Sequence, residues 1–243
     1  MKILNEFVPT RKFLKLADEL KDLVDGWNVT DGAAGFPAAS GVVVSCLLKN
    51  KYPEKYLCPI FILKYKGPVE VGSLALASDI IGLDGLAVTM GDNPRPGFGE
   101  PITQLKSSEE ARDFIRNTVK TKNPKLGCLL TARRSIEETL QRVREPWDFV
   151  YFMRLTDDSF EALKAVSAEC KKLNKPLFAY FLVGTAKNVE TVKMIGWPTA
   201  ATMETVEEKA AKLVGLVDGI IATCAGDAEG DKLMLQKLQK FRN

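Results

Sequence analysis

Histidine is absent from this sequence of 243 residues, and its absence removes a large part of enzyme chemistry. Without histidine there is no Ser-His-Asp triad, no Cys-His nucleophile pair and no zinc site with an imidazole ligand. Any acid–base step must therefore use Asp, Glu, Lys, Tyr or a bound cofactor. We expect no metal site.

Cysteine pairs, targeting signals and long apolar runs are also missing. The five cysteines lie far apart and form no CxxC pair, so we expect reduced thiols in apolar surroundings. Residues 1–9 lack the basic start and apolar core of a signal peptide, which favours a cytoplasmic location. No apolar run approaches the roughly 20 residues that span a bilayer, so no membrane partner is expected.

Charge of one sign is scarce as well. The net charge is +3 at pH 7 and no long block carries a single sign, so no nucleic-acid partner is expected. The shares of apolar residues, 46%, and charged residues, 27%, are typical of a globular protein. The length of 243 residues suits one α/β barrel or two small domains.

What the sequence does contain is a regular alternation of short β-rich runs with longer amphipathic stretches. The predicted strands span residues 3–8, 27–30, 58–63, 86–90, 126–131, 149–155, 177–183 and 219–224. The predicted helices span residues 11–24, 38–48, 69–83, 108–119, 135–143, 159–173, 188–194, 206–216 and 231–241. Because no composition break interrupts the strand–helix units, we predict a single (β/α)8 TIM barrel over residues 1–243.

A doubly wound open sheet is the alternative fold that the same alternation permits. A glycine-rich GxGxxG turn after the first strand is typical of that fold, and this sequence has none there. Strand runs such as PIFIL and GIIAT are continuously apolar, as in a parallel sheet that helices cover. The barrel is therefore favoured.

Candidate functional residues follow from this fold, because reacting groups in barrels lie at or just beyond the C-terminal ends of strands. Polar side chains at the predicted ends are Glu6, Thr30, Asp31, Lys64, Thr89, Asp92, Thr131, Arg133, Arg154, Thr185, Lys187 and Thr223. Glu6 is the strongest candidate, since a carboxylate inside an apolar strand is costly to bury without a partner. If desolvation raises its pKa, Glu6 is a competent general acid. The alternative is a carboxylate paired with Lys or Arg on a neighbouring strand.

Two turns after predicted strands contain small or polar residues that suit a flat ligand. Asp31 and Gly32 begin the first turn, and Gly91, Asp92 and Asn93 form the second. An ordinary strand–helix connection explains either turn equally well. Lys64, Lys66 and Arg133 are candidates for binding phosphates or carboxylates, with solvated surface charges as the alternative reading.

Taken in order, these segments resemble the methylenetetrahydrofolate reductase family. The motifs are Asn5-Glu6-Phe7-Val8-Pro9, Asn28-Val29-Thr30-Asp31-Gly32-Ala33, and residues 74–94, which include Gly91-Asp92-Asn93-Pro94. The resemblance implies a (β/α)8 barrel with a flavin at the strand C-termini. It also implies that Glu6 is the general acid and Asp92 an acid near flavin and pterin.

The resemblance further implies which residues contact the ligands. Cofactor contacts are expected at Thr30, Asp31, Gly32, Thr89, Gly91, Asp92 and Asn93, and substrate contacts at Glu6, Met153 and Tyr180. The sequence departs from the family pattern at several positions. The family's histidine after the third strand is missing, Met153 replaces a glutamine, Asp31 replaces an aromatic residue, and the chain is shorter between the fourth and sixth strands. FAD is the expected cofactor, with FMN or no flavin as alternatives.

Three functions remain open from the sequence. The first is flavin-dependent reduction of methylene-tetrahydrofolate, or of an archaeal tetrahydropterin analogue, to the methyl form. The second is a flavin-free C1-pterin methyltransferase or a subunit of a C1-transfer complex, and the third is a barrel that changed its chemistry. A homo-oligomer, or a complex with an electron-donor subunit, is the expected assembly.

Overall fold

A computed structural model of the chain describes residues 1–242. Its strands are β1 (Lys2–Phe7), β2 (Gly26–Val29), β3 (Tyr56–Leu57), β4 (Ile60–Ile62), β5 (Gly85–Thr89), β6 (Lys125–Thr131), β7 (Phe149–Met153), β8 (Leu177–Gly184), β9 (Ala201–Thr202) and β10 (Gly219–Thr223). Strands that pair within each of the two units described below run parallel, as the apolar runs predicted.

Helices follow the strands in the alternation that the sequence predicted. The α-helices are α1 (Phe13–Leu20), α2 (Gly41–Lys51), α3 (Pro68–Ile81), α4 (Ser108–Asp113), α5 (Ile136–Arg144), α6 (Phe160–Lys172), α7 (Val189–Ile195), α8 (Val206–Ala211) and α9 (Ala228–Leu238). Short helical segments are η1 (Lys21–Leu23), η2 (Ala33–Gly35), η3 (Phe114–Val119, a π-helix) and η4 (Gln239–Phe241). This element order is that of an α/β barrel. No helix within residues 1–242 is long and apolar enough to cross a bilayer.

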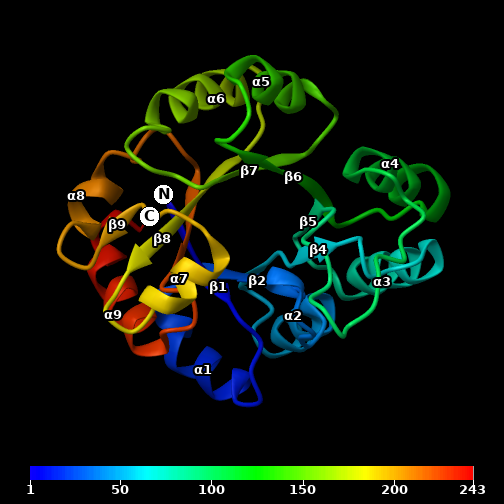
Figure 1. Ribbon diagram of the computed structural model, residues 1–243, viewed down its shortest axis with the longest axis horizontal. Coiled ribbons are helices and arrows are strands. Elements are labelled where there is room, and N and C mark those ends of the chain that lie inside the picture. The colour runs from blue at the N-terminus through cyan, green and yellow to red at the C-terminus, as the bar shows by residue number, and fades with distance from the viewer. Residues whose placement is uncertain (243) are drawn as a thin grey trace. The chain divides into compact units, whose positions relative to one another are not determined.

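The chain divides into two compact units. The first unit comprises Met1–Glu6, Lys15–Gly26 and Leu129–Asn243, and the second comprises Phe7–Leu14 and Trp27–Cys128. In the first unit the strand order is β1-β10-β8-β7, with β9 beside β8 (Figure 1). Ile221 of β10 pairs with Leu4 of β1 and with Tyr180 of β8. Parallel pairing brings the C-terminal ends of these strands to one edge.

In the second unit β5 lies between β4 and β6 (Figure 1). Thr89 pairs with Ile62 of β4, and Val88 pairs with Cys128 of β6. The core around β2 is aromatic, since the ring of Trp27 lies 6.0 Å from that of Phe7 and 5.4 Å from that of Tyr52. This packing fixes the strand ends that carry the turns singled out in the sequence.

Two predicted strands are shorter than expected, and two short strands are new. Of the predicted strand at residues 58–63 only β4 (Ile60–Ile62) forms, and Pro59, which has no N–H to donate to a sheet, separates it from β3 (Tyr56–Leu57), where no strand was predicted. The predicted strand at residues 149–155 ends at Met153, since Arg154 takes the left-handed backbone conformation with φ 63°. The two-residue strand β9 lies after the Trp197-Pro198 break, where the sequence predicted no strand.

Helix boundaries show which local signals were informative. Ser135 caps α5, and with Glu138 it forms a capping box, which confirms the predicted start. The predicted helix at residues 231–241 begins earlier, at Ala228, because Asp227 is the N-cap and accepts a hydrogen bond from Gly230 N at 3.0 Å. This shift places Asp231 inside α9.

Candidate functional site

Glu6 lies at the C-terminal end of β1 in the first unit. Its carboxyl accepts hydrogen bonds from the side chains of Thr223, the last residue of β10, and Tyr180 of β8. Thr223 and Tyr180 are each only 2% exposed, whereas Glu6 is half-buried. Side chains from three neighbouring strands thus converge on one carboxyl, with Tyr180 in the middle of β8, and two of the residues predicted to contact substrate are in contact.

The surroundings of Glu6 shift its protonation equilibrium. Burial raises the pKa of the Glu6 carboxyl, and the hydrogen bonds from Thr223 and Tyr180 offset part of this rise. Among the described residues, no Lys or Arg forms an ion pair with Glu6, so the alternative reading of a structural ion pair is not realised. A carboxyl that keeps its proton nearer to neutral pH, beside two hydroxyl groups, is suited to donate that proton to a ligand.

A second carboxyl, that of Asp231, lies close enough for its charge to interact with that of Glu6. Asp231 is in the first turn of α9, is 6% exposed, and accepts a hydrogen bond from Cys224 N at 2.6 Å. Burial raises the pKa of Asp231 to about 7; hydrogen bonds from Cys224 and Asn5 lower it, and the charges of Glu6 and Asp227 raise it further. The negative charge of Glu6 thus adds to the effect of burial on the pKa of Asp231.

Asp231 is expected to make the protein less stable as the pH rises from about 4 to about 7. Its pKa is about 7 in the folded chain against a reference value of 3.8, so in this window the folded state holds a proton that the unfolded state has released. The free energy of unfolding then falls with pH, by a few kcal/mol at most, and levels off above about pH 7. Asp231→Asn, which is nearly isosteric with the protonated acid, should remove this fall and be the more stable protein at pH 8.

Urea unfolding of both proteins at pH 5, 6, 7 and 8 measures the effect. Asp158→Asn, which neutralises an exposed carboxyl, is the matched control and should follow the unsubstituted protein at every pH. An Asp231→Asn protein that loses stability with pH as steeply as the parent would show that Asp231 is not the titrating group.

In the same unit β7 ends at Met153, and Arg154 directly follows it. Met153 is 6% exposed, and Phe152 before it pairs with Ala179, the residue that precedes Tyr180. The Arg154 guanidinium donates a hydrogen bond to the carbonyl oxygen of Gly196 and lies 5.7 Å from the centroid of the Trp197 ring. The Trp197 ring in turn lies 5.9 Å from the Tyr180 ring. A continuous set of contacts therefore joins Arg154 to the Glu6 cluster through two aromatic side chains.

In the second unit, the turn after β2 and the loop after β5 pack directly on each other. Arg95 N donates to Gly35 O, and Arg95 Nε donates to Ala34 O, both at 3.0 Å. A Cβ on Gly35 would lie 2.1 Å from the carbonyl oxygen of Asn93, and the φ of Gly35 is +78°. Only glycine fits this contact, which brings together the two turns that the sequence singled out.

Several predicted cofactor residues in the second unit are occupied by contacts within that unit. The Asp31 carboxylate accepts a hydrogen bond from Lys66 Nζ at 2.6 Å, and both residues are buried, with 8% and 5% exposure. Thr30 Oγ1 lies 3.5 Å from Phe7 O. Thr89 Oγ1 accepts a hydrogen bond from Gly91 N at 3.4 Å. The Asp31 carboxylate is therefore the anionic partner of Lys66 in a buried ion pair.

Gly91 and Gly32 approach their neighbours closely. A Cβ on Gly91 would lie 2.5 Å from Ile62 Cγ2, and a Cβ on Gly32 would lie 3.1 Å from the Tyr65 ring. The φ of Gly91 is +81°, so both its conformation and its contact require glycine. These two glycines shape the turns through packing.

The turn of Asp92 and Asn93 contains two of the residues that the family resemblance assigns to the cofactor. Both residues are exposed, and their orientation is fixed: Tyr65 Oη donates to Asp92 O at 2.6 Å, and Lys64 Nζ donates to Asn93 Oδ1 at 2.5 Å. Within residues 1–242 the Asp92 carboxylate forms no ion pair. Across the same residues, no group of three or more Cys, Asp or Glu side chains is arranged to hold a metal ion.

A cavity of about 660 Å³ opens beside the end of β8 in the first unit. Among its lining residues are Thr185, Lys187, Val192, Asp227, Glu229 and Leu233. Glu6 and Tyr180 are not among them. Asp227 caps α9 and accepts a hydrogen bond from Thr185 Oγ1 at 2.8 Å, while Glu229 pairs with Lys187. Acidic side chains therefore occupy the start of α9, a position at which many barrels bind phosphate.

Sequence reasoning did not single out Asp231 or Trp197. Asp231 shares a helical face with the buried residues Met234, Leu235 and Leu238, so its spacing placed a carboxyl on an apolar stripe. This pattern was present in the sequence, but the helix was predicted to begin at residue 231, so Asp231 was interpreted as a residue at the helix start and not as part of its buried face. Trp197 has no comparable local signal, since it was read as part of a helix break.

No protein-family model and no curated protein sequence matches the chain. Solved structures are similar over nearly its whole length. The long-chain alkane monooxygenase LadA is 10% identical with a TM-score of 0.63, and covers 99% of this chain and 91% of its own. A tryptophan synthase α-subunit from Pyrococcus furiosus is 10% identical with a TM-score of 0.62, covering 98% and 96%. Orotidine 5'-monophosphate decarboxylase from Methanocaldococcus jannaschii is 13% identical with a TM-score of 0.52, covering 98% of each chain.

At such low identity these likenesses show the fold alone. LadA and the tryptophan synthase α-subunit are TIM-barrel enzymes, so the chain has the α/β barrel fold that its sequence predicted. A barrel hosts many chemistries, and function must be argued from the residues at the strand ends.

Proposed function

We propose that the chain reduces methylene-tetrahydrofolate, or an archaeal tetrahydropterin analogue, to the methyl form with a flavin. The observation that carries this proposal is the half-buried Glu6 carboxyl at the end of β1, with hydrogen bonds from Tyr180 and Thr223 and no cationic partner among the described residues. In a chain without histidine, such a carboxyl is the natural proton donor. The family resemblance of residues 5–9 assigns the same role to Glu6.

The chemistry needs one proton and one hydride. Glu6 donates its proton to the nitrogen that leaves when one C–N bond of the methylene bridge breaks, and the one-carbon unit remains as an iminium cation on the other nitrogen. The hydrogen bonds of Tyr180 and Thr223 then stabilise the Glu6 carboxylate that forms. The hydride that turns the iminium carbon into a methyl group would come from a reduced flavin when one is bound. Asp92 and Asn93 are the residues that would hold the polar edge of FAD, or of FMN.

A flavin-free pterin-binding protein, either a methyltransferase or a C1-complex subunit, is the second candidate. The observation in its favour is the state of Asp31 and Thr30, two of the residues assigned to the flavin. The Asp31 carboxylate is paired with buried Lys66, and the hydroxyl of Thr30 faces the carbonyl of Phe7. Neither polar group is directed to a ligand.

Visible absorption of the purified protein, before and after incubation with FAD or FMN and gel filtration, separates the two candidates. Retained flavin bands that bleach on chemical reduction, and return when methylene-tetrahydrofolate is added without oxygen, are the expected result. Methyl-tetrahydrofolate should form in equal amount. A protein that binds tetrahydrofolate tightly and rejects both flavins would instead support the flavin-free candidate. Bound, reduced flavin that no methylene-pterin reoxidises would refute the reductase.

A further inference from the structure

Two arginines stand at neighbouring strand ends of the first unit, without an acidic partner. Arg133 follows β6 by two residues and Arg154 directly follows β7. Among the described residues no carboxylate forms an ion pair with either guanidinium. The charge of Arg133 nevertheless reaches Arg154, whose pKa is lowered first by burial and then by this repulsion. Two cations that repel each other, one of them half-buried, would be stabilised by an anion.

Arg154 also takes a costly backbone conformation. Its φ of 63° lies in the left-handed region, which long side chains rarely adopt because Cβ crowds the following carbonyl oxygen. This conformation of Arg154 ends β7 at Met153 and turns the chain out of the strand direction. Strain of this kind concentrates at binding sites, where the surrounding structure enforces it.

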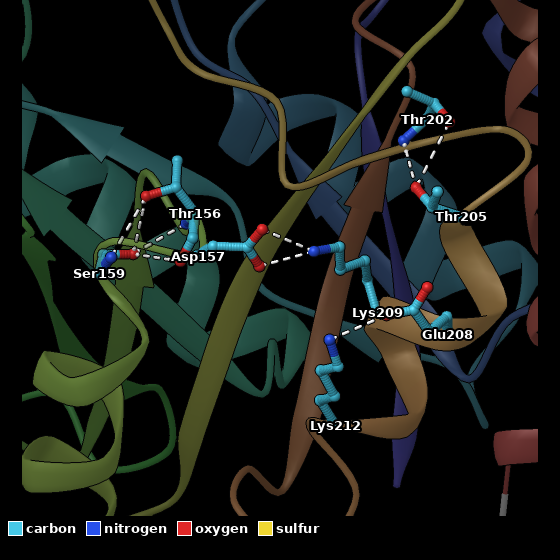
Figure 2. A network of polar contacts seen from close by, with 8 residues as sticks. All are labelled: Thr156, Asp157, Ser159, Thr202, Thr205, Glu208, Lys209 and Lys212. Carbon is cyan, nitrogen blue, oxygen red and sulfur yellow. Dashed lines mark hydrogen bonds and ion pairs between the residues drawn. The ribbon is translucent and has the colours of Figure 1, made fainter.

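The segment that follows Arg154 is braced on both sides, as Figure 2 shows. Thr156 N donates to Ser159 Oγ at 2.8 Å, and Lys209 Nζ of α8 donates to both carboxylate oxygens of Asp157 at 2.6 and 2.7 Å. Ser159 Oγ also donates to the carbonyl oxygen of Arg154 at 3.5 Å. These contacts order the loop before any ligand arrives, which lowers the entropic cost of binding.

The Arg154 guanidinium keeps unused donors. One N–H bonds to Gly196 O, and the plane lies over the Trp197 ring at 5.7 Å from the centroid. A guanidinium carries five N–H donors in a planar fork that matches carboxylate and phosphate oxygens. Trp197 contacts Tyr180, and Tyr180 donates to Glu6, so this fork is two aromatic rings away from the proton donor.

We infer that Arg154, assisted by Arg133, binds an anionic group, carboxylate or phosphate, at the far end of the ligand that Glu6 protonates. The inference rests on the proposed function for the identity of the end of the ligand that reacts. The anionic group at its other end is inferred from the two arginines. The ligand class is then a pterin whose planar spacer passes Tyr180 and Trp197 and ends in an acid. A bare pterin ring lacks the anionic group.

Calorimetric binding of two probes tests this inference. The probes are tetrahydrofolate, which carries a carboxylate tail, and 6-methyl-tetrahydropterin, which carries none. We expect Arg154→Ala to weaken tetrahydrofolate binding by about 10- to 100-fold and to leave 6-methyl-tetrahydropterin binding unchanged. Arg154→Lys, which keeps the charge and loses the fork, should fall between. Arg134→Ala removes an exposed arginine from the same loop as Arg133 and is the matched control.

A second variant serves as the control for loss of folding. Arg154→Gly relieves the left-handed strain, so it should melt no lower than the parent while losing the same affinity for tetrahydrofolate. Equal weakening of both probes, or of neither, would overturn the inference. Weaker binding of FMN relative to riboflavin, with unchanged pterin binding, would also overturn it, since the anion would then belong to the cofactor.

Failure of the proposed function gives a different result. If the protein never reduces a methylene-pterin but Arg154→Ala still weakens tetrahydrofolate binding selectively, the anion site stands and the reductase does not. If the unsubstituted protein binds neither pterin, free p-aminobenzoylglutamate and inorganic phosphate are the probes. Binding of either that depends on Arg154 supports the anion site, and the absence of both overturns it.

Discussion

Glu6→Gln is expected to slow methylene-pterin reduction by about 10²- to 10⁴-fold, the usual contribution of a general acid. Glutamine keeps the size of the side chain and an acceptor oxygen for Tyr180 and Thr223, but it has no acidic proton to give. Reduction of the flavin by an artificial donor does not involve this proton and should continue at the parent rate. Stopped-flow spectroscopy of the two half-reactions measures each rate separately.

The pH dependence adds a second readout to the same variant. In the parent, the reduction of methylene-pterin should decline as the pH rises through the raised pKa of the Glu6 carboxyl, whereas residual activity of Glu6→Gln should lack that decline. Glu161→Gln, which changes an exposed residue of α6 in an ion pair with Lys164, is the matched control and should keep full activity. If Glu6→Gln reduces the methylene-pterin at the parent rate, the proton comes from another group.

Lys66→Met is expected to lower the free energy of unfolding by about 3–5 kcal/mol, the usual effect of removing one partner from a buried ion pair. Lys66 Nζ lies 2.6 Å from Asp31 Oδ2 and donates a second hydrogen bond to Ile62 O at 2.8 Å. Both side chains are less than 10% exposed, at 7% and 9%, so water cannot replace the lost ammonium. The variant leaves the Asp31 carboxylate buried without its countercharge.

Urea unfolding at pH 7 measures this loss, and a double variant tests its cause. Lys66→Met with Asp31→Asn removes both charges, so it should recover a large part of the lost stability through the coupling of the two sites. Lys64→Met is the matched control, since this lysine bonds to exposed Asn93 and should contribute less than about 1 kcal/mol. If the double variant is no more stable than Lys66→Met, the ion pair is not the source of the effect.

Much of the fold was predictable because its signals are local. The apolar runs that became β7, β8 and β10 are read directly from the chain, and the Ser135–Glu138 capping box marks the start of α5. The errors come from single residues that override such patterns. Pro59 delays the start of one predicted strand, and the backbone of Arg154 ends another before its apolar sequence does.

The site was predictable where a polar residue interrupts an apolar pattern. Glu6 stands out in β1 for this reason, Thr223 was placed at a strand end, and Tyr180 was assigned to the substrate by the family resemblance. The pairing of Asp31 with Lys66 was not predictable, because it depends on how two loops distant in sequence pack. The contact of Arg154 with Trp197 depends likewise on the tertiary arrangement of the segment before β9. Local sequence patterns identify the candidate site residues, and tertiary packing determines which of their side chains remain available to a ligand.

The carboxyl of Asp231 has a pKa of about 7, so this chain exchanges protons near neutral pH through a carboxyl group. In most proteins, protons exchanged near neutrality are attributed to imidazole, and this chain has none. Apart from the amino terminus and thiols, uptake or release between pH 6 and 8 must come from carboxyl groups such as Asp231. Calorimetry in buffers of different ionisation enthalpy would count those protons without an imidazole background. Difference infrared spectra would assign them through the carbonyl stretch of a protonated carboxyl.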